Sequence, residues 1–126
     1  MNRPRILLGD DHRALLEAEI ALLSPHFDVV GTAMDGAELV SEAHRLRPDV
    51  IVADISMPIL NGIDAVRRIR KSGSEAKFVF LTVHTGQEFV KACMEAGAFA
   101  YIQKPRMKHH LAPAIQAALT GQAYVL

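Results

Sequence analysis

Five polar residues in this sequence each follow closely after a short apolar run. They are the carboxylates Asp10, Asp11 and Asp54, the hydroxyl-bearing Thr82 and the ammonium-bearing Lys104. Carboxylates that crowd together repel one another, and a hard divalent cation such as Mg²⁺ relieves that repulsion through oxygen ligands. A lysine adds a second counter-charge, and a threonine adds a donor for an anion. Such a set suits phosphoryl transfer, in which a carboxylate can attack phosphorus and hold the group as an acyl phosphate.

Each of these residues taken singly has a more ordinary explanation. An aspartate after a strand is often a helix N-cap, a threonine at a strand end is usually structural, and a lone lysine is usually solvated. The prediction of a shared site therefore rests on their combination.

Five apolar runs supply the strands that would hold these residues. Several runs are β-branched or aromatic and lack polar alternation, which is typical of buried parallel strands. The runs are Ile6–Leu8, Val29–Val30, Val50–Val52, Phe78–Leu81 and Tyr101–Ile102. Amphipathic stretches follow them, so strand and helix alternate five times. We predict an α/β fold whose parallel sheet is covered on both faces by helices, with ligands at the carboxyl ends of the strands.

Cap and turn residues place the ends of several helices. Asp35 should begin the second helix and Asn61 the third. Proline is tolerated best in the first turn of a helix, so Pro113 predicts that the last helix does not begin much before His109.

Length and composition predict one domain, residues 1–126, with 50% hydrophobic residues and a net charge of zero. Nothing in the charge favours nucleic acid or an anionic membrane, and no apolar run approaches the roughly 20 residues of a membrane span. The polar segment Met1–Arg5 predicts no signal peptide. The single cysteine, Cys93, is expected to be buried and fits a reducing cytoplasm.

The longest motif is the stretch Asp54–Gly62, which resembles the phosphoacceptor motif of response-regulator receiver domains of two-component systems. The stretch Leu8–His12 resembles the acidic pair of that family, and Leu81-Thr82 and Lys104-Pro105 resemble its two remaining signatures, in the same order. The resemblance covers essentially the whole chain. It implies a flavodoxin-like, doubly wound (βα)5 sandwich with a five-stranded parallel sheet in the order 2-1-3-4-5.

The resemblance also implies the roles of the residues around the acidic cluster. Asp54 is the nucleophile and phosphoacceptor. Asp11 ligates Mg²⁺ (or Mn²⁺) directly, Asp10 contacts the ion mostly through water, and Asp54 and the backbone carbonyl of Ser56 complete the ligands. A sensor histidine kinase or phosphotransfer protein supplies the phosphoryl group. The domain promotes its own phosphorylation and dephosphorylation but is not a turnover enzyme.

The remaining implied roles concern switching. Lys104 pairs with Asp54 and then with a phosphoryl oxygen, and a cis peptide bond before Pro105 fixes its loop. Thr82 swings toward the phosphoryl group, and Tyr101 then rotates inward into the space that Thr82 leaves. The output face is the fourth helix, the fifth strand and the fifth helix.

The tail Ile115–Tyr124 resembles receivers of the LuxR/NarL type, which continue into a DNA-binding helix-turn-helix domain. That domain is absent here, so DNA would be reached only through the missing C-terminal part, and control of transcription is the expected output. A truncated chain is favoured over a stand-alone receiver, and a homodimer formed on phosphorylation is a further expectation. No membrane partner is expected.

Two positions depart from the usual pattern. Val83 stands where the family usually has Ala or Ser, and it could narrow access to the phosphoryl site or merely pack a strand end. His84 could influence hydrolysis or contact a partner, but a solvated loop histidine is an equal alternative.

Three other functions fit the sequence less well than a receiver does. A non-phosphorylated receiver-like binding module is disfavoured because all five key side chains are present. A phosphatase of the haloacid dehalogenase type needs a second aspartate where Ser56 stands. A nucleotide-binding domain would need a glycine-rich phosphate loop after a strand, which the sequence lacks.

Overall fold

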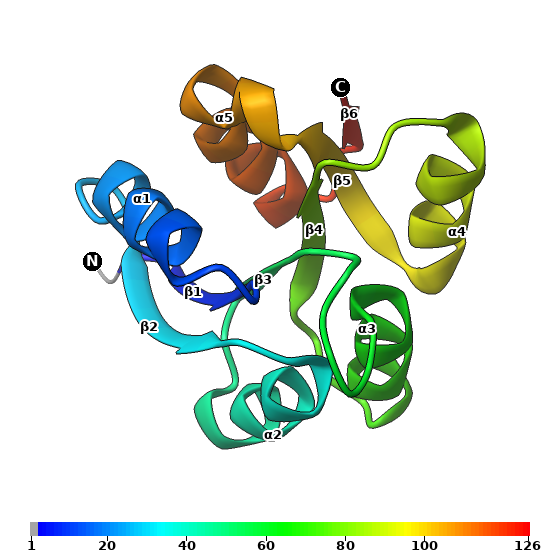
Figure 1. Ribbon diagram of the computed structural model, residues 1–126. Coiled ribbons are helices and arrows are strands. Elements are labelled where there is room, and N and C mark those ends of the chain that lie inside the picture. Colours follow the sequence, from blue (N-terminus) through cyan, green and yellow to red (C-terminus); the bar gives the residue numbers. More distant parts are fainter. Residues whose placement is uncertain (1–2) are drawn as a thin grey trace.

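The structure is a computed structural model that describes residues 3–126, so the first two residues of the polar segment Met1–Arg5 lie outside it. Six parallel strands form one sheet in the order β2-β1-β3-β4-β5-β6 (Figure 1). The strands are β1 (Arg5–Gly9), β2 (Asp28–Ala33), β3 (Val50–Ala53), β4 (Lys77–Thr82), β5 (Ala98–Gln103) and β6 (Tyr124–Val125). The helices are α1 (Arg13–Leu23), α2 (Gly36–Leu46), α3 (Gly62–Lys71), α4 (Gln87–Ala96) and α5 (Met107–Leu119), with a 3-10 turn at η1 (Lys104–Arg106).

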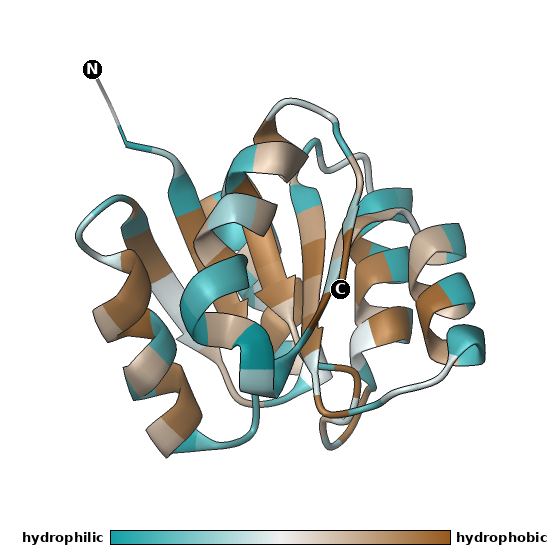
Figure 2. Cartoon of the chain, turned by 90° about the horizontal axis from the view of Figure 1, so that it is seen from above, coloured by the Kyte–Doolittle hydropathy of each residue, from teal (hydrophilic) through white to brown (hydrophobic). Residues whose placement is uncertain are grey.

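The helices form two layers, one on each face of the sheet (Figure 1). α2, α3 and α4 pack on one face around buried residues such as Leu39, Val66 and Cys93. α1 and α5 pack on the other around Leu23 and Ile115. Figure 2 shows the apolar strands between helices that turn mixed faces outward. The burial predicted for Cys93 is confirmed, and no helix within residues 3–126 is long and apolar enough to cross a membrane.

Local sequence explains why the predicted helices begin where they do. The Asp35 side chain accepts a hydrogen bond from the Glu38 backbone N–H at 2.7 Å. Asn61 accepts one in the same way from Asp64 at 2.9 Å. These caps satisfy backbone donors that have no partner inside the helix.

The sheet has six strands, so the prediction of five was wrong, although the first five follow the expected order. β6 pairs with Ala100 and Tyr101 of β5, and the backbone N–H of Leu126 donates to the Tyr101 carbonyl at 2.9 Å. A hydrogen bond of 2.8 Å also joins the Tyr124 hydroxyl to Nδ1 of His110. The extra strand forms because β5 would otherwise present an open edge of backbone donors and acceptors.

α5 begins at Met107, and Pro113 lies well inside it, contrary to the first-turn position that the sequence suggested. The proline is exposed, whereas Leu111, Ile115 and Ala118 on the opposite face are fully buried. Burial of that apolar face holds the helix together across the missing backbone hydrogen bond.

Candidate functional site

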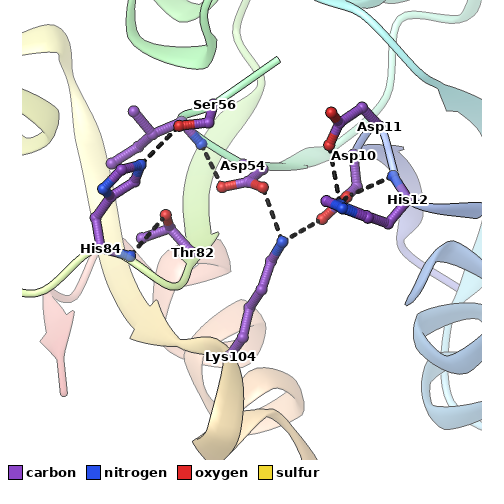
Figure 3. A network of polar contacts seen from close by, with 9 residues as sticks. Asp10, Asp11, His12, Asp54, Ser56, Thr82, His84 and Lys104 are labelled. Atoms are coloured by element: carbon purple, nitrogen blue, oxygen red, sulfur yellow. Dashed lines mark hydrogen bonds and ion pairs between the residues drawn. The ribbon is translucent and has the colours of Figure 1, made fainter. Parts of the chain in front are cut away.

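The carboxyl ends of four strands bring the predicted polar residues together at one edge of the sheet (Figure 3). Lys104 Nζ lies at the centre, 2.8 Å from Asp54 Oδ2 and 2.9 Å from Asp10 Oδ2. Asp10, Asp54 and Thr82 are 1%, 4% and 0% exposed. Buried charges require this kind of pairing, so the Asp10 and Asp54 carboxylates and the Lys104 ammonium form one electrostatic unit.

Asp54 is held in place by the backbone around it. Its N–H donates to the Gly9 carbonyl at 3.0 Å, and its Oδ1 accepts from the Ile55 N–H at 2.7 Å. The start of α3 approaches so closely that a Cβ on Gly62 would stand 1.8 Å from the Asp54 carbonyl oxygen. The glycine is therefore needed for α3 to pack against the residue that carries the central carboxylate.

Lys104 has opposing influences on its pKa. Burial by itself would lower the pKa, but the hydrogen bonds to Asp54 and Asp10 outweigh burial and raise the pKa above its ordinary value. The lysine therefore stays protonated at neutral pH and can neutralise a further anion.

The peptide bond between Lys104 and Pro105 is trans, as are all peptide bonds within residues 3–126. The prediction of a cis bond before Pro105 was therefore wrong. Pro105 occupies the first turn of η1, and the Met107 N–H donates to the Lys104 carbonyl. A trans proline suits this place because its fixed φ matches the start of a helical turn.

The acidic pair has the composition of a cation site. Ligand atoms of Asp10, Asp11 and His12 lie within 4.8 Å of one another. Oδ1 of Asp11 is buried without a hydrogen-bond partner among the described residues, although His12 Nδ1 stands 3.0 Å away. An oxygen atom left in this state is what a hard cation such as Mg²⁺ would satisfy, so the residues present fit the implied metal.

Thr82 and Tyr101 are linked through His84. The Thr82 hydroxyl oxygen accepts from the His84 N–H at 3.2 Å, and the Tyr101 hydroxyl donates to the His84 carbonyl at 2.8 Å. Tyr101 is only 1% exposed, and burial, the largest cause, raises its pKa to about 12. Tyr101 therefore lies inward, in the position to which the expected rotation would bring it, and the rotation itself stays a prediction.

The His84 side chain also has a defined place, which sequence reasoning left open. Its Nε2 lies 2.6 Å from Ser56 Oγ, and its ring stacks on Phe89 with centroids 4.4 Å apart. The alternative that His84 is a solvated loop histidine was therefore wrong. Val83 beside it is 64% exposed, so the alternative in which it packs a strand end was wrong as well.

Glu19 of α1 was missed altogether. It is 1% exposed, and its Oε2 has no hydrogen-bond partner among the described residues. Burial, the largest cause, raises its pKa to about 8, with a further contribution from Asp10 and an opposing one from Lys104. A signal was present in the sequence, because Glu19 falls on the same helical face as Leu16 and Leu23.

Comparisons with known proteins agree with this geometry. The family described as "Response regulator receiver domain" matches residues 6–116. The chain is 38% identical over 120 residues to the transcriptional regulatory protein LiaR of Bacillus subtilis (strain 168), covering 94% of this chain and 57% of LiaR. It is 31% identical over 126 residues to the transcriptional regulatory protein DegU of Brevibacillus brevis, covering 98% and 53%. The chain thus spans a little over half the length of these curated relatives.

Solved structures show the same fold. A two-component response regulator of the LuxR family from Aurantimonas sp. SI85-9A1 superposes with a TM-score of 0.92 at 34% identity, covering 98% of this chain and 89% of that one. The response regulator domain of Thermotoga maritima CheB gives 0.89 at 30% identity, covering 94% and 98%. The chain therefore belongs to the response regulator receiver domain family, with relatives of the LuxR/NarL type.

Proposed function

We propose that the chain is a phosphorelay receiver that accepts a phosphoryl group from a sensor histidine kinase or phosphotransfer protein onto Asp54. The observation that carries the proposal is the pairing of Lys104 with both Asp54 and Asp10 at the buried strand ends. A carboxylate that is nearly buried yet held by a cation is positioned for attack on phosphorus, and the same cation can neutralise charge on the transferred group.

In the proposed reaction, an oxygen of Asp54 forms a bond to phosphorus while the bond from phosphorus to the donor histidine nitrogen breaks. The freed imidazole takes a proton. Lys104 then pairs with a phosphoryl oxygen, and the Thr82 hydroxyl donates to another. Attack of water on phosphorus breaks the bond from phosphorus to the Asp54 oxygen, which regenerates the carboxylate and releases inorganic phosphate. The domain is therefore proposed to be a switch and not a turnover enzyme.

Mg²⁺ or Mn²⁺ would be held by Asp11, Asp10, Asp54 and the backbone carbonyl of Ser56, where it would neutralise charge on the phosphoryl oxygens. Asp11 Oδ1, which is buried and has no hydrogen-bond partner within residues 3–126, supports this assignment.

The output is proposed from the relatives. LiaR and DegU are named as transcriptional regulatory proteins, and this chain spans only 57% and 53% of them. We therefore propose that the chain is one domain, residues 1–126, of a cytoplasmic regulator whose DNA-binding part lies beyond it. Phosphorylation would change the α4, β5 and α5 face and promote a homodimer. A stand-alone receiver without DNA output is the alternative.

The first test is phosphorylation by a small-molecule donor. The chain is incubated with Mg²⁺ and acetyl phosphate, and its intact mass is recorded beside Asp54→Asn and metal-free samples. We expect the wild type alone to gain one phosphoryl group. No gain, together with no binding of beryllium fluoride, would favour the non-phosphorylated binding module.

Val83 provides a second test. Val83 directly follows Thr82 in the sequence and its side chain is 64% exposed. We predict that it narrows the approach to Asp54. Val83→Ala should speed phosphorylation by acetyl phosphate and speed loss of the phosphoryl group, each measured by mass over time. Equal rates in variant and wild type would refute an access role.

A further inference from the structure

Four contacts converge on His84, in the segment between β4 and α4, and Figure 3 shows the two with Ser56 and Thr82. Its ring Nε2 lies 2.6 Å from Ser56 Oγ, and its ring stacks on Phe89 of α4 with centroids 4.4 Å apart. Its backbone N–H donates to Thr82 Oγ1 at 3.2 Å, and its carbonyl accepts from the Tyr101 hydroxyl at 2.8 Å. One residue thus connects the loop after Asp54, the end of β4, the start of α4 and the middle of β5.

The side chain of His84 is the anchor of this segment. The neighbouring residues Val83, Thr85 and Gly86 are exposed, so within residues 83–86 only His84 is partly covered. The position of the His84 backbone therefore depends on what its ring contacts, namely Ser56 and Phe89.

The His84 backbone in turn decides the state of Tyr101. The tyrosine is 1% exposed, and a buried hydroxyl without a partner is unfavourable. The His84 carbonyl supplies that partner. As long as His84 keeps its place, the Tyr101 hydroxyl has a hydrogen-bond partner in the inward position.

The same backbone orients Thr82. A hydroxyl group has one proton to donate and lone pairs to accept with. Because Thr82 Oγ1 accepts from the His84 N–H, its own proton remains available to donate to an anion beside Asp54.

We propose that Ser56 and His84 are positioning residues whose side-chain contact holds Tyr101 inward and leaves Thr82 ready to donate. The inference rests on the proposed receiver function, and it goes beyond it by assigning roles to two side chains that bind neither the phosphoryl group nor the phosphodonor. A ligand that needs this arrangement binds more tightly in proportion to the fraction of molecules that already have it.

The position of Tyr101 can be observed directly because the chain has two tyrosines and no tryptophan. Labelling with 3-fluorotyrosine gives two ¹⁹F resonances, and Tyr124→Phe assigns the one from Tyr101. Without Mg²⁺ or phosphate analogue, we expect the Tyr101 resonance of the wild type to be shielded from solvent. Ser56→Ala and His84→Phe should both move it toward the solvent-exposed position, because His84→Phe keeps a ring on Phe89 but loses the nitrogen.

Ser56→Thr is the matched control, since it keeps the hydroxyl group at an exposed position and should retain the wild-type resonance. An unchanged Tyr101 resonance in both Ser56→Ala and His84→Phe would overturn the inference, as would an equal shift in Ser56→Thr.

The second measurement is the affinity for beryllium fluoride with Mg²⁺. Loss of one hydrogen bond corresponds to about a two- to tenfold change in an equilibrium constant, so Ser56→Ala and His84→Phe should each bind about two- to tenfold more weakly. The double variant should be no weaker than either single one, because both changes break the same contact. Additive losses would contradict a shared contact. Failure of the wild type to bind would instead refute the proposed function, while the ¹⁹F result would still decide on the contact itself.

Discussion

At the scale of single residues, some buried carboxyl groups of the site have ion-pair partners, whereas another has an oxygen without a hydrogen-bond partner among the described residues. Asp54 and Asp10 share Lys104, and the carboxylates are almost completely buried. Glu19, by contrast, is buried in α1 with an oxygen that has no partner among the described residues. Its pKa of about 8 means that it remains largely protonated at neutral pH. A neutral carboxyl group behind the charged pocket avoids adding a fourth negative charge to it.

Glu19 predicts a pH dependence of stability. Its pKa is raised from 4.5 to about 8 in the folded chain, so the folded state retains a proton that the unfolded state loses between these values. Stability should therefore fall as pH rises from about 5 to 8, by roughly 2–4 kcal/mol. Urea unfolding at several pH values measures this, and Glu19→Gln should remove that part of the pH dependence. A Gln variant with the same pH profile would contradict the assignment.

At the scale of elements, N-cap residues determine where helices begin, and buried apolar faces stabilise them. Asp35 and Asn61 begin α2 and α3 by accepting backbone hydrogen bonds. α5 shows the opposite case, because Pro113 interrupts its hydrogen bonding and only the burial of Leu111, Ile115 and neighbouring alanines maintains it. β6 similarly exists because the edge of β5 offers backbone partners to Tyr124 and Val125.

The interrupted helix can be repaired. Pro113→Ala should restore a backbone donor in α5 and raise the free energy of unfolding by about 1–3 kcal/mol, since an interior proline is strongly unfavourable and the loss of chain stiffness offsets only part of the gain. Urea unfolding measures the change. Gln116→Ala, also exposed on α5, is the control and should lie within about 0.5 kcal/mol of the wild type. A stability gain no larger than the control would show that α5 accommodates the proline without penalty.

At the scale of the whole molecule, the parallel sheet gathers residues from distant parts of the sequence at one edge. Lys104 and Asp54 are 50 positions apart in the chain, yet their charged atoms lie 2.8 Å from each other. The crowding of Asp10, Asp11 and Asp54 is a repulsive arrangement that Lys104 relieves in part. A cation at this edge should therefore stabilise the entire fold.

Thermal unfolding tests this expectation. Mg²⁺ at ten times its Kd should raise the free energy of unfolding by about 1.4 kcal/mol and the Tm by a few degrees. Asp11→Asn removes a proposed ligand and should reduce the shift, while Na⁺ at equal ionic strength should have little effect. An equal rise in the Asp11→Asn variant would place the cation elsewhere.

The sequence by itself determined the alternation of strands and helices, the order of the first five strands and the group of residues at their carboxyl ends. These features depend on local apolar patterns, on caps and on the fact that parallel strands end at the same edge. The position of Pro113 inside α5 and the sixth strand depended on neighbours that packing supplies.

The contact between Ser56 and His84 joins residues 28 positions apart, and no local pattern announces such a pair. The inward position of Tyr101 likewise follows from a partner on another strand's loop. Hydrogen bonds between distant side chains require both backbones to be placed to within about an ångström, because bonding weakens steeply with distance and angle. Only the tertiary structure fixes positions that finely, so it alone decided how Thr82 and Tyr101 are held.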